Sequence, residues 1–246
     1  KRDDLVLEEI TLLNQVGKYI QAKRKLDAHI FHPWEGGEGK VPAQYQICRV
    51  ELAKQNIAEG KYKCAVGLLE QCLTYPHHLG EGKLYGAQEN DFYYLLGVAY
   101  DAQGNSKKAK ECWEKAVLGP QEPAAAMYYN DAKPDKIFYQ GMAMRKLGRE
   151  DEAHGRFYRL INYGKQHVFE HQTMDYFAVS LPDLLIWDDS LDTKNVIHCK
   201  YMLALGYCGM GDMKHALKYL AEVEALDNNH QGAQQLRSLI DLNLLS

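Results

Sequence analysis

A chain of 246 residues that is 46% hydrophobic and 25% charged has the composition of an ordinary globular protein. Its formal net charge of -4, from 29 basic and 33 acidic residues, excludes the basic surface expected of a protein that binds nucleic acid or an anionic membrane. The longest apolar stretch of the C-terminal half, residues 177–187, contains Pro182 and Asp183 and is too short to span a bilayer.

The six cysteines include no Cys-x-x-Cys pair, and most of them fall within helical patterns. A free cysteine in such a place behaves as a small buried hydrophobe. Because disulfides belong to oxidising compartments, the sequence predicts reduced thiols in a cytoplasmic protein. The chain starts at Lys1, without a Met or a secretory signal, and we therefore expect it to be a piece of a longer protein.

Five segments of the chain share the frame Gly-x-x-x-x-Ala. Their glycines are separated by 43, 44, 44 and 63 residues, and a nearly fixed period of this size is typical of repeat proteins. The five frames are Gly17 to Ala22, Gly60 to Ala65, Gly104 to Ala109, Gly148 to Ala153 and Gly211 to Ala216.

A helix pair is predicted around each copy of the frame. The first pair is the least regular, as expected at the end of a repeat array, where one face has no neighbour. A long insertion follows the fourth pair, and a capping helix with Leu236, Ile240 and Leu244 at four-residue spacing follows the fifth. The predicted pairs occupy residues 3–30, 46–74, 90–118, 134–161 and 197–226, the insertion residues 162–195, and the cap residues 231–245.

The third pair carries the pattern most clearly. Tyr93, Leu96 and Tyr100 recur at helical spacing and form one face. Gly104 then ends the first helix, since glycine accepts the left-handed conformation at a helix C-terminus. Ala109 and Trp113 begin the apolar face of the second helix. A small alanine lets the two helices approach closely, which predicts a helical hairpin.

This order of aromatic, Leu-Gly, Tyr, Gly, Ala and aromatic residues resembles the tetratricopeptide repeat, a hairpin of ~34 residues. The longer period places the surplus residues in the loops between hairpins. We therefore expect one all-α domain over residues 1–246. It would be a right-handed solenoid of about five tetratricopeptide-like helical hairpins, with long inter-repeat loops and a C-terminal capping helix. Stacked repeats usually present an extended binding surface, which favours a binding role over an enzyme.

Two of the inter-repeat loops end in the same motif, Gly-Glu-Gly-Lys. They are Phe-His-Pro-Trp-Glu-Gly-Gly-Glu-Gly-Lys at residues 31–40 and Tyr-Pro-His-His-Leu-Gly-Glu-Gly-Lys at residues 75–83. A nucleotide-binding P-loop requires Ser or Thr after its Gly-Lys, so that a hydroxyl reaches the magnesium ion. Here the lysines are followed by Val41 and Leu84. No nucleotide is predicted, and we expect no cofactor.

The loops carry a closer resemblance. Residues 32–40, residues 86–91 (Gly-Ala-Gln-Glu-Asn-Asp) and residues 176–185 (Tyr-Phe-Ala-Val-Ser-Leu-Pro-Asp-Leu-Leu) resemble the C-terminal helical half of a family of large bacterial proteins. In that family a β-sandwich region akin to sugar-processing enzymes, itself of unassigned function, precedes the helical half. The resemblance covers residues 29–233 and implies an upstream partner domain. It brings no catalytic residues to this chain.

The concave face of the predicted solenoid is the first candidate binding surface, for a protein or peptide. In tetratricopeptide proteins the first helix of each hairpin lines this face, and an apolar strip there is rarely left bare. The alternative is that the chain's own residues 161–195 fill the groove, and the sequence does not decide between the two or predict an oligomeric state. The candidate groove residues are Lys54, Tyr94, Asp101, Phe138, Met142, Arg145 and Tyr201.

The loops between repeats are the second candidate surface. Trp34 stands beside Glu35, and an aromatic ring next to a carboxylate is a common way to hold a sugar. The loops would then complete a site on the upstream β-sandwich, making the chain an accessory part of a carbohydrate-active enzyme. The favoured interpretation, however, is that the tryptophan simply anchors its Gly-rich loop on the helices. The candidate loop residues are His32, Trp34, Glu35, Glu38, Lys40, His77, His78, Glu81 and Lys83.

Two further clusters are better explained by structural roles. His167 and His171 would share a helix face and, with Asp175, could ligate a metal, but they lack the glutamate of a His-Glu-x-x-His motif. Asp188 and Asp189 could form an acid–base pair, yet capping an apolar segment is the commoner role. The sequence thus predicts no metal, no catalytic residue, no nucleic acid and no membrane partner.

Overall fold

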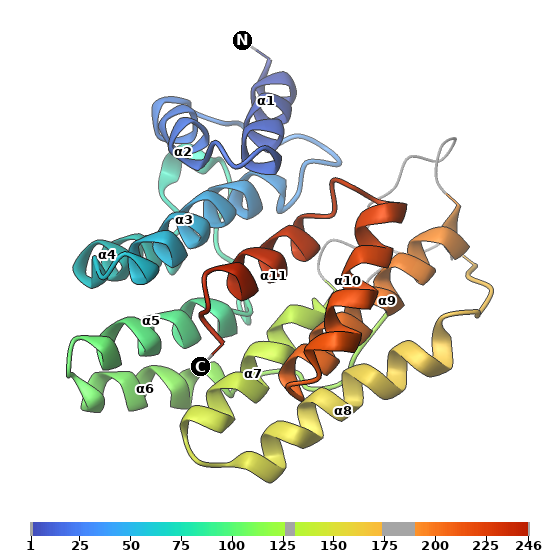
Figure 1. Ribbon diagram of the computed structural model, residues 1–246. Coiled ribbons are helices and arrows are strands. Elements are labelled where there is room, and N and C mark those ends of the chain that lie inside the picture. Colours follow the sequence, from blue (N-terminus) through green and yellow to red (C-terminus); the bar gives the residue numbers. More distant parts are fainter. Residues whose placement is uncertain (1, 126–130, 174–189, 246) are drawn as a thin grey trace. The chain divides into compact units, whose positions relative to one another are not determined.

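The computed structural model is helical over the residues it describes, 2–125, 131–173 and 190–245, and contains no strand within them (Figure 1). The all-α prediction is therefore confirmed. The chain divides into two compact units, Lys1–Cys112 with Ser238–Ser246, and Trp113–Arg237. The handedness of the solenoid, the number of repeats and the single-domain organisation stay predictions.

In the first unit, consecutive helices pack against one another along the chain. Helix α1 packs on α2 and α3 on α4, while α3 also contacts α1 and α2, and α4 contacts α5 (Figure 1). The elements are α1 (Asp3–Gln15), α2 (Tyr19–Ala28), α3 (Lys40–Ala58), α4 (Tyr62–Cys72), the 3-10 turn η1 (His77–Leu79), α5 (Asn90–Ala102) and α6 (Ser106–Ala116), which continues into the second unit.

In the second unit, α8 packs on both α7 and α9, and α9 also packs on α7 and α10. The elements are α7 (Pro134–Lys146), α8 (Glu150–His167), α9 (Leu191–Gly209), α10 (Met213–Leu226) and the first part of α11 (Gln231–Asp241).

The glycine of the repeated frame ends the first helix of each pair, as the sequence predicts. Its φ is positive in all five copies, from 73° to 79°, a conformation that glycine adopts without steric cost. The next residue donates its backbone N–H back to a carbonyl of the last helical turn, which satisfies an orphaned acceptor. These bonds are Lys18 to Leu13, Lys61 to Asn56, Asn105 to Tyr100, Arg149 to Met144 and Asp212 to Tyr207.

Three helix boundaries differ from the prediction by six residues each. Helix α3 begins at Lys40 rather than near residue 46, directly after Gly39, whose φ is 73°. Helix α9 begins at Leu191 rather than near 197, because the Ser190 hydroxyl caps it by accepting a hydrogen bond from the N–H of Thr193 (3.4 Å). Helix α8 continues to His167. The predicted insertion is shortened at both ends, and its residues 174–189 lie outside the described part of the chain.

Arg49 on α3 ties together three helices of the first unit. Its side chain is only 2% exposed. The guanidinium donates to the Asp27 carboxylate on α2 and to Gln71 Oε1 on α4 (3.0 Å), and it lies 3.4 Å from the centre of the Tyr45 ring. A buried guanidinium is tolerated only when its charge and its donors are satisfied in this way.

Phe157 on α8 is the centre of packing in the second unit, where it fills the space left by glycines on two neighbouring helices. Its side chain is fully buried. A Cβ atom added at Gly141 of α7 would lie 2.4 Å from the ring, and one at Gly209 of α9 would lie 2.2 Å from it. The glycines therefore set how closely α7 and α9 approach α8.

Gly141→Ala is expected to destabilise the protein by about 1–3 kcal/mol, because the new methyl group overpacks against a ring that has no room to move. The matched control is Gly155→Ala in α8, where an added Cβ meets nothing within 4 Å. That change should stabilise by about 0.5–1 kcal/mol, since alanine favours a helix over glycine. Denaturant unfolding measures both, and stabilisation by both substitutions would contradict the packing.

Candidate functional site

The predicted groove residues are mostly buried by the chain itself. Five of the seven side chains are buried: Lys54, Tyr94, Phe138, Met142 and Tyr201. The sequence left open whether a partner or the chain's own residues 161–195 cover this face, and it gave no sign of the contacts that bury it here. Their role in binding a partner stays a prediction.

Three of these buried aromatic side chains have identified contacts. In the first unit, the Tyr94 hydroxyl approaches the carbonyl of Leu244 (3.5 Å), near the C-terminus. In the second unit, the Tyr201 ring lies 4.8 Å from the ring of His230, centre to centre. Phe138 packs on the ring of Phe157 (6.0 Å between centres). A substitution such as Phe138→Glu would thus disturb the core before it tested any ligand.

Lys54 pairs with Glu51 inside the first unit, with Nζ 2.6 Å from Oε1. The two remaining groove residues are less buried. Asp101 is exposed on α5. Arg145, predicted as a hot spot for a partner, donates from Nη2 to the carbonyl of Gly209 (2.8 Å) and from Nε to Glu150 (3.0 Å). Its guanidinium therefore serves to hold the end of α9 against α7.

The loop residues give a different result, because the two copies of the Gly-Glu-Gly-Lys motif lie side by side. Glu81 Oε2 of the second copy accepts a hydrogen bond from the N–H of Gly39 in the first (2.8 Å). Phe31 N–H donates to the carbonyl of His78 (2.8 Å), and a Cβ at Gly80 would lie 2.6 Å from the Phe31 oxygen. We call these two loops, residues 29–40 and 73–89, the loop edge.

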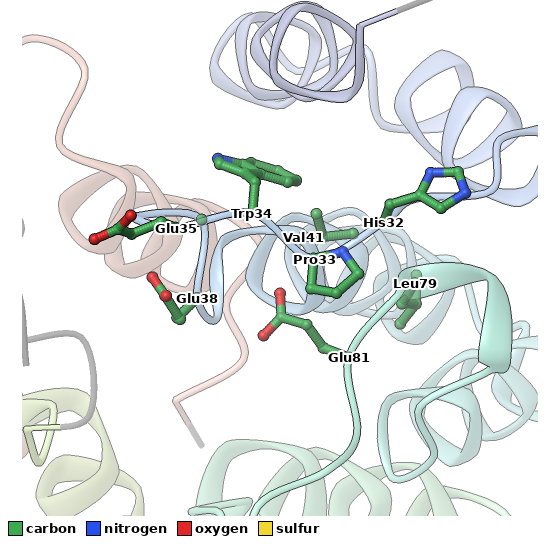
Figure 2. A pocket seen from close by; sticks show the side chains of 9 residues that line it. His32, Pro33, Trp34, Glu35, Glu38, Val41, Leu79 and Glu81 are labelled. Carbon is green, nitrogen blue, oxygen red and sulfur yellow. The ribbon is translucent and has the colours of Figure 1, made fainter.

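A cavity of about 290 Å³ opens at the loop edge (Figure 2). Glu81 extends from the second loop toward the first, which carries Trp34, Glu35 and Glu38 (Figure 2). The indole of Trp34 packs directly over Gly37, where an added Cβ would lie 2.3 Å from the ring. The lining residues are His32, Pro33, Trp34, Glu35, Gly37, Glu38, Val41, Leu79 and Glu81.

Carboxylates dominate the electrostatics of this cavity. The pKa of Glu81 is raised, mainly because the carboxyl is partly buried and additionally because Glu38 carries a like charge. The hydrogen bond from the Gly39 N–H opposes this rise in pKa. The cavity therefore holds negative charge in a partly desolvated place.

A second hollow of about 620 Å³ adjoins the first and shares His32, Pro33 and Trp34 with it. On its wall, Asp3 at the start of α1 accepts hydrogen bonds from His29 Nε2 (2.7 Å) and from the backbone N–H of His32 (2.8 Å). The hydrogen bond with His29 and then that with the His32 backbone lower the pKa of Asp3 to about 2. Sequence reasoning missed Asp3 and His29, because no local pattern connects residues that far apart.

The remaining loop candidates do not line either hollow. Lys40 is the first residue of α3, and His77 is exposed on η1. His78 packs edge-on against the ring of Tyr45 (6.3 Å between centres). Lys83 forms an ion pair with Glu89 and donates to the carbonyl of Leu73 (3.1 Å). The structure thus brings together His32, Trp34, Glu35, Glu38 and Glu81 at one cavity, whose lining includes neither lysine of the motif.

The two histidines considered as metal ligands pair instead with neighbouring carboxylates. His167 Nδ1 lies 2.6 Å from Glu170, and His171 Nδ1 lies 2.9 Å from Asp192. Among the described residues, no three His, Cys, Asp or Glu side chains are grouped as a metal site would require. Asp175, Asp188 and Asp189 lie outside the described residues. No described helix is both long and apolar enough to span a membrane.

No family model matches the chain. Two solved structures are similar to it over most of its length, both of nearly identical TPR-like repeats of a protein from Podosopora anserina described as a kinesin light chain. One, a single-substitution variant, has a TM-score of 0.38 and 17% identity, covering 93% of this chain and 95% of that chain. The other has a TM-score of 0.37 and 17% identity, covering 91% and 93%.

The regular elements in the described part of the chain are helices, and these solved structures similar to it are TPR-like repeat proteins. A sequence identity of 17% with such low TM-scores identifies no ligand and no activity for this chain.

Proposed function

We propose that the chain is a protein-binding module with no catalytic role of its own, and that it docks its partner through the loop edge. The partner is another protein or another domain of the parent protein. This moves the predicted binding surface away from the first-helix residues, because the contacts that bury Tyr94, Phe138 and Tyr201 would have to break before those residues could bind.

The proposal rests on two properties of the loop edge: its loops are bonded to each other, and it exposes apolar side chains. Hydrogen bonds hold its two loops together, as between Gly39 and Glu81, so the surface is preorganised. It nevertheless exposes large apolar side chains, with Ile30 at 64%, Leu84 at 61% and Tyr85 fully exposed. Exposed aromatic and aliphatic groups beside a cavity are typical of protein interaction sites.

A pair of photo-crosslinking variants tests this proposal. A photoreactive phenylalanine analogue replaces Tyr85 on the loop edge in one variant and Tyr158 on α8, which is 54% exposed, in the other. In extracts of the source cells, we expect a defined crosslinked partner from position 85 and none from position 158. Equal adducts at both positions, or adducts only at position 158, would overturn docking at the loop edge.

A second candidate function is the accessory role in a carbohydrate-active enzyme. It is favoured by Trp34 lying in one cavity with Glu35 and Glu38, since a sugar ring can stack on an indole while its hydroxyls bond to carboxylates. Titration with soluble oligosaccharides, followed through the indole N–H signal of Trp34, separates the candidates. A saturable change with a sugar would favour the accessory role over protein docking.

A further inference from the structure

The repeated Gly-Glu-Gly-Lys motif brings two glutamates to one cavity. Glu38 and Glu81 are 43 positions apart in the sequence, yet both line the same space of about 290 Å³. Glu35 adds a third carboxylate. Apart from His32, the described lining residues include no basic side chain. A cleft lined by one sign of charge concentrates ions of the opposite sign, here cations.

Neither lysine of the motif lines the cavity. Lys83 is held away by its ion pair with Glu89 and its bond to the Leu73 carbonyl, and Lys40 does not line the cavity. The hydrogen-bond partner that the structure shows for Glu81 is a backbone amide, that of Gly39. Burial, and secondarily the like charge of Glu38, raises the pKa of Glu81.

The rest of the lining suits a cation carried on an alkyl stem. The indole of Trp34 also lines the cavity, although it packs over Gly37 and against the hydrophobic core. An indole is the best aromatic partner for a cation, and Pro33, Val41 and Leu79 supply apolar surface. The volume is at the small end of the ~300–1,000 Å³ typical of ligand pockets, which fits a side chain better than a larger molecule. A guanidinium matches this lining better than an ammonium, because it is planar, weakly hydrated and able to bond carboxylates in pairs.

We infer that this cavity binds the guanidinium group of an arginine side chain, presented by the protein segment that docks on the loop edge. The stem lies along Pro33 and Val41, and the charged end contacts the carboxylates beside the indole. The adjoining hollow of about 620 Å³ gives room for residues that flank the arginine. The identity of the partner rests on the proposed docking function, whereas the chemistry of the cavity is tested separately.

The first experiment uses N-acetyl-arginine amide as the probe and N-acetyl-citrulline amide, which has the same shape without the charge, as its control. The isotope-labelled chain is titrated with each, and the indole N–H signal of Trp34, assigned with Trp34→Phe, is followed by NMR. We expect saturable binding of the arginine amide, about tenfold or more tighter than that of the citrulline amide. Equal responses, or no saturation with arginine, would overturn the inference.

The matched variants are Glu38→Gln with Glu81→Gln, and Glu111→Gln on α6 as the control that removes charge outside the cavity. A glutamine oxygen at position 81 can still accept the Gly39 N–H, so the loops should hold, and thermal unfolding checks this. We expect arginine binding to weaken about tenfold or more in the double variant and to persist in the control. If the double variant unfolds, Glu38→Gln alone serves the same comparison.

The outcomes separate the cavity from the docking function. A partner crosslinked at position 85 that binds the double variant as tightly as the unmodified chain would leave docking intact and overturn the arginine cavity. Arginine amide binding that depends on Glu38 and Glu81, without any partner at the loop edge, would support the cavity and overturn docking.

Discussion

Lys54→Met is expected to destabilise the protein by about 3–5 kcal/mol, because it leaves the Glu51 carboxylate buried without its cation. Lys54 is fully buried and Glu51 is 2% exposed, and Nζ lies 2.6 Å from Oε1. Tyr19 lies near the same carboxylate. Its burial, and secondarily the charge of Glu51, raise its pKa to about 12. Water cannot replace the lysine as a partner for the carboxylate at such a place.

The control for this prediction removes both charges. The double variant Lys54→Met with Glu51→Leu removes both members of the pair, and replacing a buried pair by apolar side chains is often neutral or stabilising. Denaturant unfolding followed by circular dichroism compares the two variants. A single-variant loss below about 1 kcal/mol would mean that the pair behaves like one on the surface and that Lys54 is open to solvent.

Phe157→Ala is expected to cost about 3–5 kcal/mol in the free energy of unfolding, since it removes the ring around which α7, α8 and α9 pack. Phe157 is fully buried, with the ring of Phe138 6.0 Å away and the Arg145 guanidinium 5.3 Å from its centre. Gly141 and Gly209 have no side chains that could move into the vacated space. The cavity would therefore stay largely open.

Two comparisons make this second prediction specific. Tyr158→Ala, at the next position of α8, removes an aromatic ring that is 54% exposed and should change stability by no more than about 0.5 kcal/mol. Gly141→Ala, destabilising in the unmodified chain, should become neutral or stabilising when combined with Phe157→Ala, because the methyl group then fills space. Additive effects of the two substitutions would refute a direct contact between the glycine and the ring.

Much of the helical organisation follows from the sequence alone, because its signals are local. The frame glycines predicted where the first helices end, and each adopts a positive φ with the hydrogen bond expected at such an end. The alanines of the frame, such as Ala109 and Ala153, are fully buried as their size suggested. Both signals depend on residues within one or two helical turns of each other.

The sequence also marked the loop edge through its repeated motif, but it did not reveal how the two copies meet. Spacing alone could not predict that Glu81 would accept a hydrogen bond from Gly39, or that Lys83 would turn to Glu89. These pairings depend on where α2, α3 and α4 place the ends of their loops. Periodicity indicates that such helices exist, whereas the orientation of a side chain on a loop depends on all of its neighbours.

Only the tertiary structure decided which of the candidate residues remain open. Tyr94 contacts Leu244, 150 residues away, and Tyr201 contacts His230. For the helix face that carries both tyrosines, the sequence had left open either a partner or the chain's own residues 161–195. The burial of a residue depends on every segment that packs on its helix face. Contacts between segments far apart in the chain produce no periodic pattern in the sequence. Helix positions were therefore determined by local sequence, and the available surface by long-range packing.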